Sequence, residues 1–351
     1  MLECLPDTID RVPDDPSSRF RSHLNYIESF ALLGGLALPT TTATAIERLS
    51  ARARPLLTDA PPPAVDVDQV HRSLRNAWST ELLLALPGQW ATDDDEFMRL
   101  SNTWGVVQTY YVGYHATQAL IIAKGNARPE NHPKTQRQYA ALWVDRPLLL
   151  PPWTFGCASP GWVNLPAGEA IDGSINSWTG ATSSTAWSLA AKALTTTRRA
   201  AVKDAVDRKR NDKQRERRND WRSEEQSGIA AGRRPRTEPT FSRPQLSAPE
   251  KSAADRGVRT FTLLDYLYRL RIGANYDDAA VFFDGPTQSF ESSTVHRSLV
   301  FLAAGSMLLA ELRISALVGR ATLQQWGADF TATCIPTGHR SIGLALRQAL
   351  W

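Results

Sequence analysis

The chain has 351 residues, of which 42% are hydrophobic and 22% charged, a composition typical of a globular protein rather than a disordered one. Its three cysteines, Cys4, Cys157 and Cys334, lie far apart, which excludes a disulfide framework or a cysteine-based zinc cluster and favours a reducing compartment. The formal net charge is +4, and the length allows two or three domains.

We expect a soluble, cytoplasmic protein. The first residues, MLECLPDTIDRVPDD, have neither a basic start nor an apolar run, so no signal peptide is expected. The longest nearly apolar stretch, 298–310, has 13 residues. A membrane span needs about 18–20 residues, so the sequence predicts no membrane association.

Helices are predicted over residues 19–38, 41–57 and 66–86, because apolar residues recur there at helical spacing. An acidic start at 93–96 suits the positive end of a helix dipole, and the next helix is predicted to run from there to Gly125. Pro133 is placed to open a further helix, since proline is favoured in the first helical turn.

The middle of the chain breaks this pattern. Residues 147–184 are rich in Pro, Gly, Ser and Thr, with several tryptophans, which predicts a packed irregular insertion. A solvated helix is predicted over 185–226, and a flexible linker over 227–257. Two strongly apolar helices follow, over 261–276 and 295–319, and a short helix is predicted at 341–351. Long helices with few strand signals predict an all-α helical bundle.

The positive charge is concentrated in one segment. Residues 192–259 carry 19 Lys and Arg against 10 Asp and Glu, a local balance of +9, whereas the rest of the chain is mildly acidic. Such asymmetry points to a polyanionic partner, with arginine suited to phosphate. The predicted nucleic-acid contacts are Arg198, Arg199, Lys203, Arg208, Lys209, Arg210, Lys213, Arg215, Arg217, Arg218 and Arg222. A solvated strut or a protein-binding face is the competing interpretation.

Two segments on either side of the insertion together resemble the HEPN superfamily of small helical bundles, found in prokaryotic toxins and antiviral ribonucleases. The first is YYVGYHATQALIIAKG, which begins at Tyr110 and is followed by His132. The second is YRLRIGANYDD, residues 268–278, followed by an apolar helix. The resemblance covers under a third of the chain and implies a HEPN-type up-and-down bundle with a long basic helical insertion.

The resemblance implies five parts for the chain. An N-terminal helical region would occupy 1–92 and the first half of the bundle 93–146. The insertion would occupy 147–257, the second half of the bundle 258–320, and a C-terminal extension 321–351. The resemblance also implies a homodimer or hetero-oligomer that cleaves RNA without a metal, and a nucleotidyltransferase or other defence-system protein as a possible partner.

Active members of the family carry an arginine followed after four to six residues by a histidine, and this chain departs from that signature. From Arg271 the position reached is Tyr276, and a phenol is a poor base at neutral pH. His115 and His132 lie on the preceding helices and could approach Arg271, because histidine serves in either proton role. The predicted catalytic residues are Arg271, Tyr276, His115, His132, Arg269 and Asn275.

Each of these residues also has a structural interpretation. Arg271 could pair with Asp277 or Asp278, and Tyr276 could be a hydrogen-bonded core tyrosine. His115 lies on an aromatic face where a structural histidine is common, and His132 could cap a helix. Asn275 could organise the turn after the helix.

Two functions are therefore predicted. The first is an RNA-cleaving effector or toxin of an antiphage or toxin–antitoxin system, with RNA as its partner. The second is a catalytically inactive subunit that binds nucleic acid within a multiprotein defence complex. No cofactor and no metal is predicted, because the chain lacks a P-loop, a dinucleotide fingerprint and histidines at ligand spacing.

Overall fold

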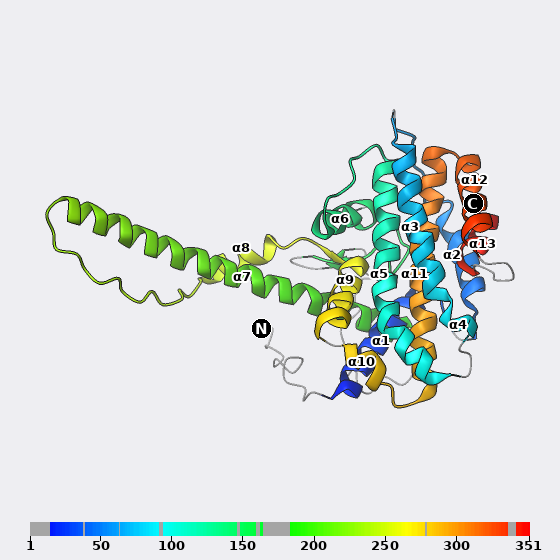
Figure 1. Cartoon of the computed structure of the whole chain (residues 1–351), viewed down its shortest axis with the longest axis horizontal. Coiled ribbons are helices and arrows are strands. Elements are labelled where there is room, and N and C mark those ends of the chain that lie inside the picture. The colour runs from blue at the N-terminus through cyan, green and yellow to red at the C-terminus, as the bar shows by residue number, and fades with distance from the viewer. Residues whose placement is uncertain are drawn as a thin grey trace.

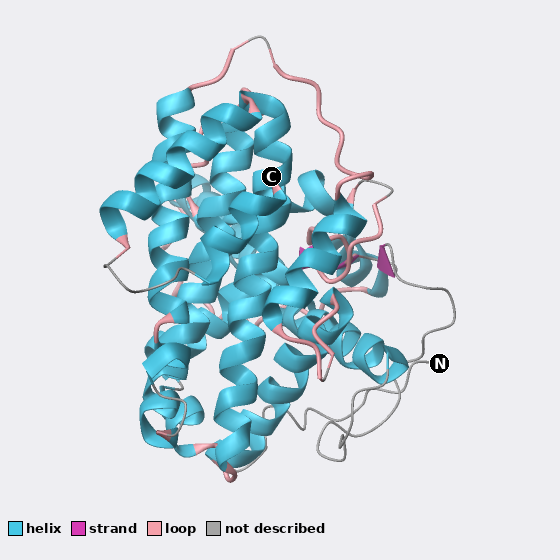
Figure 2. Cartoon of the chain, turned by 90° about the vertical axis from the view of Figure 1, so that its right-hand side faces the viewer, coloured by secondary structure: helices cyan, strands magenta, loops and turns pink. Residues whose placement is uncertain are grey.

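A computed structural model describes residues 15–37, 39–62, 64–90, 94–145, 148–158, 162–163, 183–277, 279–335 and 342–351. These residues are predominantly helical, which confirms the all-α prediction (Figure 2). The α-helices are α1 (Pro16–Gly34), α2 (Thr42–Ala53), α3 (Val67–Ala85), α4 (Pro87–Trp90), α5 (Asp95–Ala123), α6 (His132–Tyr139), α7 (Ser183–Ala230), α8 (Ala248–Arg256), α9 (Leu263–Ile272), α10 (Ala279–Asp284), α11 (Ser289–Val318), α12 (Arg320–Cys334) and α13 (Ile342–Leu350). Two π-helical turns follow α6 and α9, namely η1 (Ala140–Val144) and η3 (Gly273–Asp277).

The bundle is built around α5 and α11, which lie side by side (Figure 1). Both helices are buried over most of their length, as the nearly continuous apolar sequence of each requires. Helix α3 packs along α5, and α1 and α2 pack against α11. The segments before and after the insertion, and the N-terminal helices, therefore share one hydrophobic core.

Side-chain caps determine where several helices begin. Asp15, Thr41, Asp66, Asp94 and Asn131 each accept a hydrogen bond from a backbone N–H group in the first turn of the following helix. These groups have no partner within the helix, so the caps stabilise each start by about 1 kcal/mol.

A small antiparallel sheet connects the insertion to the bundle. Strand β1 (Gly156–Cys157) lies between β2 (Trp162–Val163) and β3 (Phe261–Thr262), with Cys157 opposite Phe261. Because β3 leads directly into α9, the sheet places the beginning of the insertion next to the helix that carries Arg271. Short strands in this region agree with the irregular insertion predicted there, and residues 164–182 lie outside the described part of the chain.

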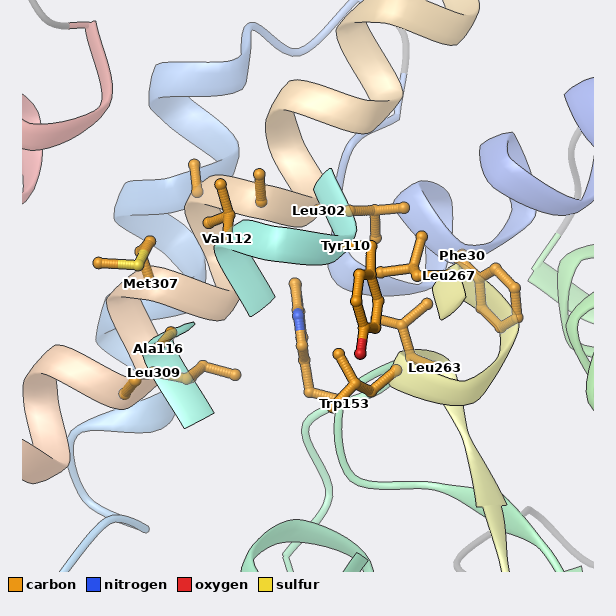
Figure 3. Close-up of a cluster of buried hydrophobic side chains, with 14 of the residues drawn as sticks. Phe30, Tyr110, Val112, Ala116, Trp153, Leu263, Leu267, Leu302, Met307 and Leu309 are labelled. Carbon is orange, nitrogen blue, oxygen red and sulfur yellow. The ribbon is translucent and has the colours of Figure 1, made fainter. Parts of the chain in front are cut away.

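Trp153 fills the centre of the core beside Tyr110, Leu263 and Leu267 (Figure 3). Its indole Nε1 donates a hydrogen bond to Ser306 Oγ at 3.0 Å, and its ring packs against Phe301. The ring also lies directly on Gly305 of α11, where a Cβ atom would come within 2.6 Å of Trp153 Cη2. Glycine is therefore needed at position 305 so that the indole can approach the helix backbone.

We expect Gly305→Ala to lower the free energy of unfolding by about 1–3 kcal/mol, because the added methyl group overpacks the core against a rigid indole. Gly113→Ala on α5 is the matched control. Its Cβ would meet Leu264 Cδ1 at 3.3 Å and Ser306 Oγ at 3.9 Å, and alanine favours the helix. Urea denaturation measures both variants, and equal stability of the two would contradict this account of Gly305.

Two buried charge clusters connect distant helices. The Arg313 guanidinium pairs with Asp59 at 2.5 Å and donates to the Leu142 carbonyl oxygen, and Lys124 also pairs with Asp59. Burial opposes ionisation of Asp59, but the hydrogen bonds and charges of Arg313 and Lys124 outweigh it and hold the pKa of the carboxyl group well below its usual range. The second cluster joins Arg347 of α13 to Glu81 and Glu311.

The basic insertion forms an arm, which we define as residues 207–256. The second half of α7 leaves the bundle, and the chain returns alongside it to α8 (Figure 1). Glu238 of the return segment pairs with Arg218 and Arg222, and Arg236 pairs with Glu225 of α7 at 2.6 Å. The structure thus corrects the expectation of a flexible linker at 227–257, since ion pairs and the helix α8 hold this segment against α7.

Most predicted helices are present with boundaries shifted by a few residues, and the main addition is α12. The predicted extension at 321–351 contains α12 as well as the short helix expected near its end. Helix α12 buries only Leu323, Gly327 and Phe330, an apolar stripe too thin to be recognised from periodicity. The chain turns between α11 and α12 at Gly319, whose φ of 94° disfavours residues with a side chain.

Within the described residues, one helix, α11, is long and apolar enough to cross a membrane. Of its most apolar window, 72% is buried inside the bundle. This burial is typical of the core helix of a soluble protein.

Candidate functional site

Aromatic, histidine and arginine side chains gather where α5, the start of α6 and α9 meet. We call this set the aromatic cluster, and it consists of Tyr110, Tyr111, Tyr114, His115, His132, Tyr268 and Arg271. Tyr110 and Tyr114 are buried, whereas the other members are half-buried and reach the surface. Helical geometry explains the grouping, because residues three or four positions apart lie on one face of α5 and of α9.

His132 lies at the centre of this cluster. Its Nδ1 atom is 2.7 Å from the Tyr110 hydroxyl oxygen, and its ring centroid is 4.7 Å from that of Tyr114 and 5.3 Å from that of Tyr268. The cap on Asn131 and the following Pro133 begin α6 at this point and hold the imidazole against α5. The capping role considered for His132 therefore belongs to Asn131.

Arg271 lies over three tyrosine rings. Its Cζ atom is 5.2 Å from the ring centroid of Tyr111, 5.7 Å from that of Tyr268 and 5.9 Å from that of Tyr110. Among the described residues its guanidinium has no hydrogen-bond or ion-pair partner, and its Nε is buried. Cation–π contacts orient the group while leaving its N–H donors available. The pairing considered with Asp277 or Asp278 lies outside the described side chains.

The electrostatic environment of the two histidines is cationic. Burial, and next the Arg271 charge, lower the pKa of His132 below its ordinary value. Burial, and next the Arg128 charge, lower the pKa of His115 to about 4. Both imidazoles are therefore neutral at pH 7. Among the described residues no carboxylate contributes to either shift, and such a site favours an anionic ligand.

The remaining predicted catalytic residues occupy different places. His115 stacks on Tyr111 with ring centroids 6.0 Å apart, and its buried Nδ1 has no hydrogen-bond partner. Arg269 is exposed on another side of α9, where its charge acts on His23 of α1, and it does not join the cluster. Asn275 is exposed in η3, and the side chain of Tyr276 lies outside the described part of the structure.

The predicted nucleic-acid contacts divide into two groups. Six of the basic side chains are paired with carboxylates, namely Arg198, Arg210, Lys213, Arg215, Arg218 and Arg222. Five have no ion-pair partner among the described residues, namely Arg199, Lys203, Arg208, Lys209 and Arg217.

Arg198 is a correction to the predicted contacts. Its buried guanidinium pairs with Asp255 at 2.5 Å and donates to the carbonyl oxygens of Asp255 and Val258. It therefore fastens α7 to the end of α8 rather than facing solvent, where a phosphate could reach it.

Sequence reasoning did not identify the four tyrosines as part of the site. Tyr110, Tyr111 and Tyr114 precede His115 directly, and Tyr268 lies one turn before Arg271. Aromatic residues at helical spacing more often form a core, and only the packing of α9 on α5 shows that three of these rings, those of Tyr110, Tyr111 and Tyr268, lie under one guanidinium.

In the part of the chain that the structure describes, no group of three or more His, Cys, Asp or Glu side chains is arranged to hold a metal ion. In comparisons with protein-family models, curated proteins and solved structures, nothing matches this chain.

Proposed function

We propose that the protein is a ribonuclease that cleaves RNA at the aromatic cluster without a metal ion. The observation that carries this proposal is Arg271, whose guanidinium lies beside a neutral imidazole and has no carboxylate partner among the described residues. A guanidinium whose N–H donors are not taken by a carboxylate can bind a phosphodiester, and a neutral imidazole can accept a proton.

The reaction uses the ribose 2′-hydroxyl as the nucleophile. With the Nδ1 proton of His132 donated to the Tyr110 oxygen, Nε2 accepts the 2′-hydroxyl proton as the 2′-oxygen attacks phosphorus. The bond from phosphorus to the 5′-oxygen breaks, and that oxygen takes a proton from water. The proton held on His132 Nε2 then neutralises the hydroxide that is left. The products are a 2′,3′-cyclic phosphate and a 5′-hydroxyl. Arg271 stabilises the added negative charge on the phosphoryl oxygens.

Tyr110 keeps His132 in the required orientation. Burial raises the pKa of the Tyr110 phenol above its usual range, so the group stays protonated and serves as a hydrogen-bond partner rather than a base. Tyr110 is a positioning residue, and Arg271 and His132 are the proposed catalytic residues.

The wider setting follows the family resemblance. The bundle would be of HEPN type and act as a dimer or hetero-oligomer in the cytoplasm, as an effector of an antiphage or toxin–antitoxin system. A nucleotidyltransferase or another defence-system protein would be its partner. The basic side chains of α7 that have no ion-pair partner among the described residues, such as Lys203, Lys209 and Arg217, would contact the RNA backbone.

A second candidate function is nucleic-acid binding without cleavage. It is favoured by the weakness of His115 as an acid–base group, because burial and the Arg128 charge lower its pKa to about 4. At neutral pH His115 is a neutral imidazole and a poor proton donor to the leaving oxygen. A site in which only one imidazole takes part in proton transfer is a modest catalyst.

The test is incubation of the purified protein with total RNA and with a DNA of matched sequence, both in EDTA. We expect cleavage of RNA alone, with 2′,3′-cyclic phosphate ends. Because the pKa of His132 is lowered in the folded protein, the rate should rise with pH through a value below 6.5 and level off before pH 7. RNA binding without products would favour the second candidate, and cleavage of DNA would contradict the proposal.

A further inference from the structure

Helix α5 presents an apolar face to solvent in its first half. Phe97, Leu100 and Trp104 are 39%, 52% and 63% exposed, although the outer face of a helix in a soluble bundle is ordinarily polar. The opposite face of α5 packs on α3 and α11, so the core does not require these side chains. An exposed apolar stripe of this kind marks a binding surface.

The stripe leads into the aromatic cluster. Trp104, Gln108, Tyr111 and His115 follow one another at intervals of three or four residues, which places them on one face of the helix. Trp104 and Tyr111 are seven residues apart, or about 10 Å along the axis at 1.5 Å per residue. Trp104, the most exposed indole among the described residues, therefore lies two helical turns from Tyr111, the ring over which the Arg271 guanidinium lies.

Charge differs between the two ends of this face. Asp94, Asp95 and Glu96 precede Phe97 at its beginning, where Arg99 pairs with Asp95 and leaves the other two carboxylates in excess, whereas Arg128 and Arg271 act at its other end. A polyanion would be repelled at the acidic end and attracted at the cationic end. The segment from Trp104 to His132 is thus the part of the face that a nucleic-acid strand can follow.

We infer that Trp104 stacks on an unpaired base of a single-stranded RNA whose phosphate reaches Arg271. This inference rests on the proposed function and adds the substrate class. Base–aromatic stacking needs a flat exposed ring and tolerates any sequence, and each stacked base contributes about 1–3 kcal/mol. Stacking also requires bases that are free of a duplex, so paired RNA is excluded from the site.

The stripe is too narrow for the main alternative, a protein interface. Only Phe97, Leu100 and Trp104 are both apolar and exposed along it, whereas a stable interface buries about 800 Å² on each partner. The flanking residues Ser101, Thr103 and Gln108 are polar. A single strand needs no wider surface.

The experiment measures binding of a fluorescent, fully 2′-O-methylated oligonucleotide, single-stranded or annealed to its complement. Because the 2′-oxygen is blocked, the affinity is read whether or not the protein cleaves RNA. We expect tight binding of the single strand only, and a Kd about 10-fold higher or more for Trp104→Ala. Leu83→Ala, which removes another exposed apolar side chain, on α3, is the matched control and should leave the Kd unchanged.

Equal affinity of Trp104→Ala and the unaltered protein, or preference for the duplex, would overturn the inference. So would a dimer that Trp104→Ala converts to a monomer in sedimentation analysis, since the stripe would then be a protein interface. Binding that depends on Trp104 in a protein that leaves unmodified RNA intact would support the inference and reject the nuclease. The two proposals can therefore fail separately.

Discussion

Replacing Arg271 by alanine should lower the rate of RNA cleavage by about 100–1,000-fold. The guanidinium is the only positively charged group among the described residues that lies over the rings of Tyr110, Tyr111 and Tyr268, next to His132. Removing one preorganised group that stabilises transition-state charge has an effect of this size in other enzymes. Single-turnover cleavage of a defined RNA measures the rate of the chemical step.

Two further variants make the result specific. Arg269→Ala removes an exposed arginine of the same helix that lies outside the cluster, and it should retain activity. Arg271→Lys keeps the charge but loses the planar fork, so we expect only partial recovery. Equal rates for Arg269→Ala and Arg271→Ala would show that Arg271 holds no phosphate in the reaction.

Replacing Arg347 by leucine should lower the free energy of unfolding by about 3–5 kcal/mol. Arg347 is fully buried and pairs with Glu81 at 2.5 Å and with Glu311 at 2.7 Å. The indole N–H groups of Trp78 and Trp351 also donate to Glu311. Without the guanidinium, two carboxylates remain buried with no other ion-pair partner among the described residues, and breaking a buried pair in this way has a cost of that size.

Chemical denaturation at several pH values tests this prediction. Burial already raises the pKa of Glu81, and loss of Arg347 would raise it further. When the pKa of a carboxyl group is higher in the folded state than in the unfolded state, the folded state binds more protons. The free energy of unfolding of the variant should therefore recover partly as the pH falls towards the pKa of the carboxyl group in the unfolded chain.

Arg215→Leu is the control for Arg347→Leu. Arg215 forms an exposed pair with Asp212, and such pairs contribute about 0–1 kcal/mol. An equally small effect of Arg347→Leu would contradict the assignment of a stabilising role to the buried cluster.

Much of the local structure can be read from residues that act within a single helix. The caps at Asp94 and Asn131 and the turn at Gly319 depend on side chains and backbone within a few positions. Apolar spacing identifies α5 and α11 because each is buried against several neighbours along its length. The segment predicted as a flexible linker was misjudged, since Gly, Pro and Ser suggested flexibility while its ion pairs with α7 connect residues up to 57 positions apart, as Arg198 and Asp255 do.

The all-α class, most helix positions and the concentration of positive charge in one insertion follow from the sequence alone, because these properties depend on composition and on contacts between near neighbours. Which positively charged side chains a phosphate can reach depends instead on how the helices pack. Arg271 and Arg198 are both arginines in basic helical segments, yet one lies on tyrosine rings while the other is buried against Asp255. That difference arises from the packing of helices distant in the chain, and no local pattern encodes it.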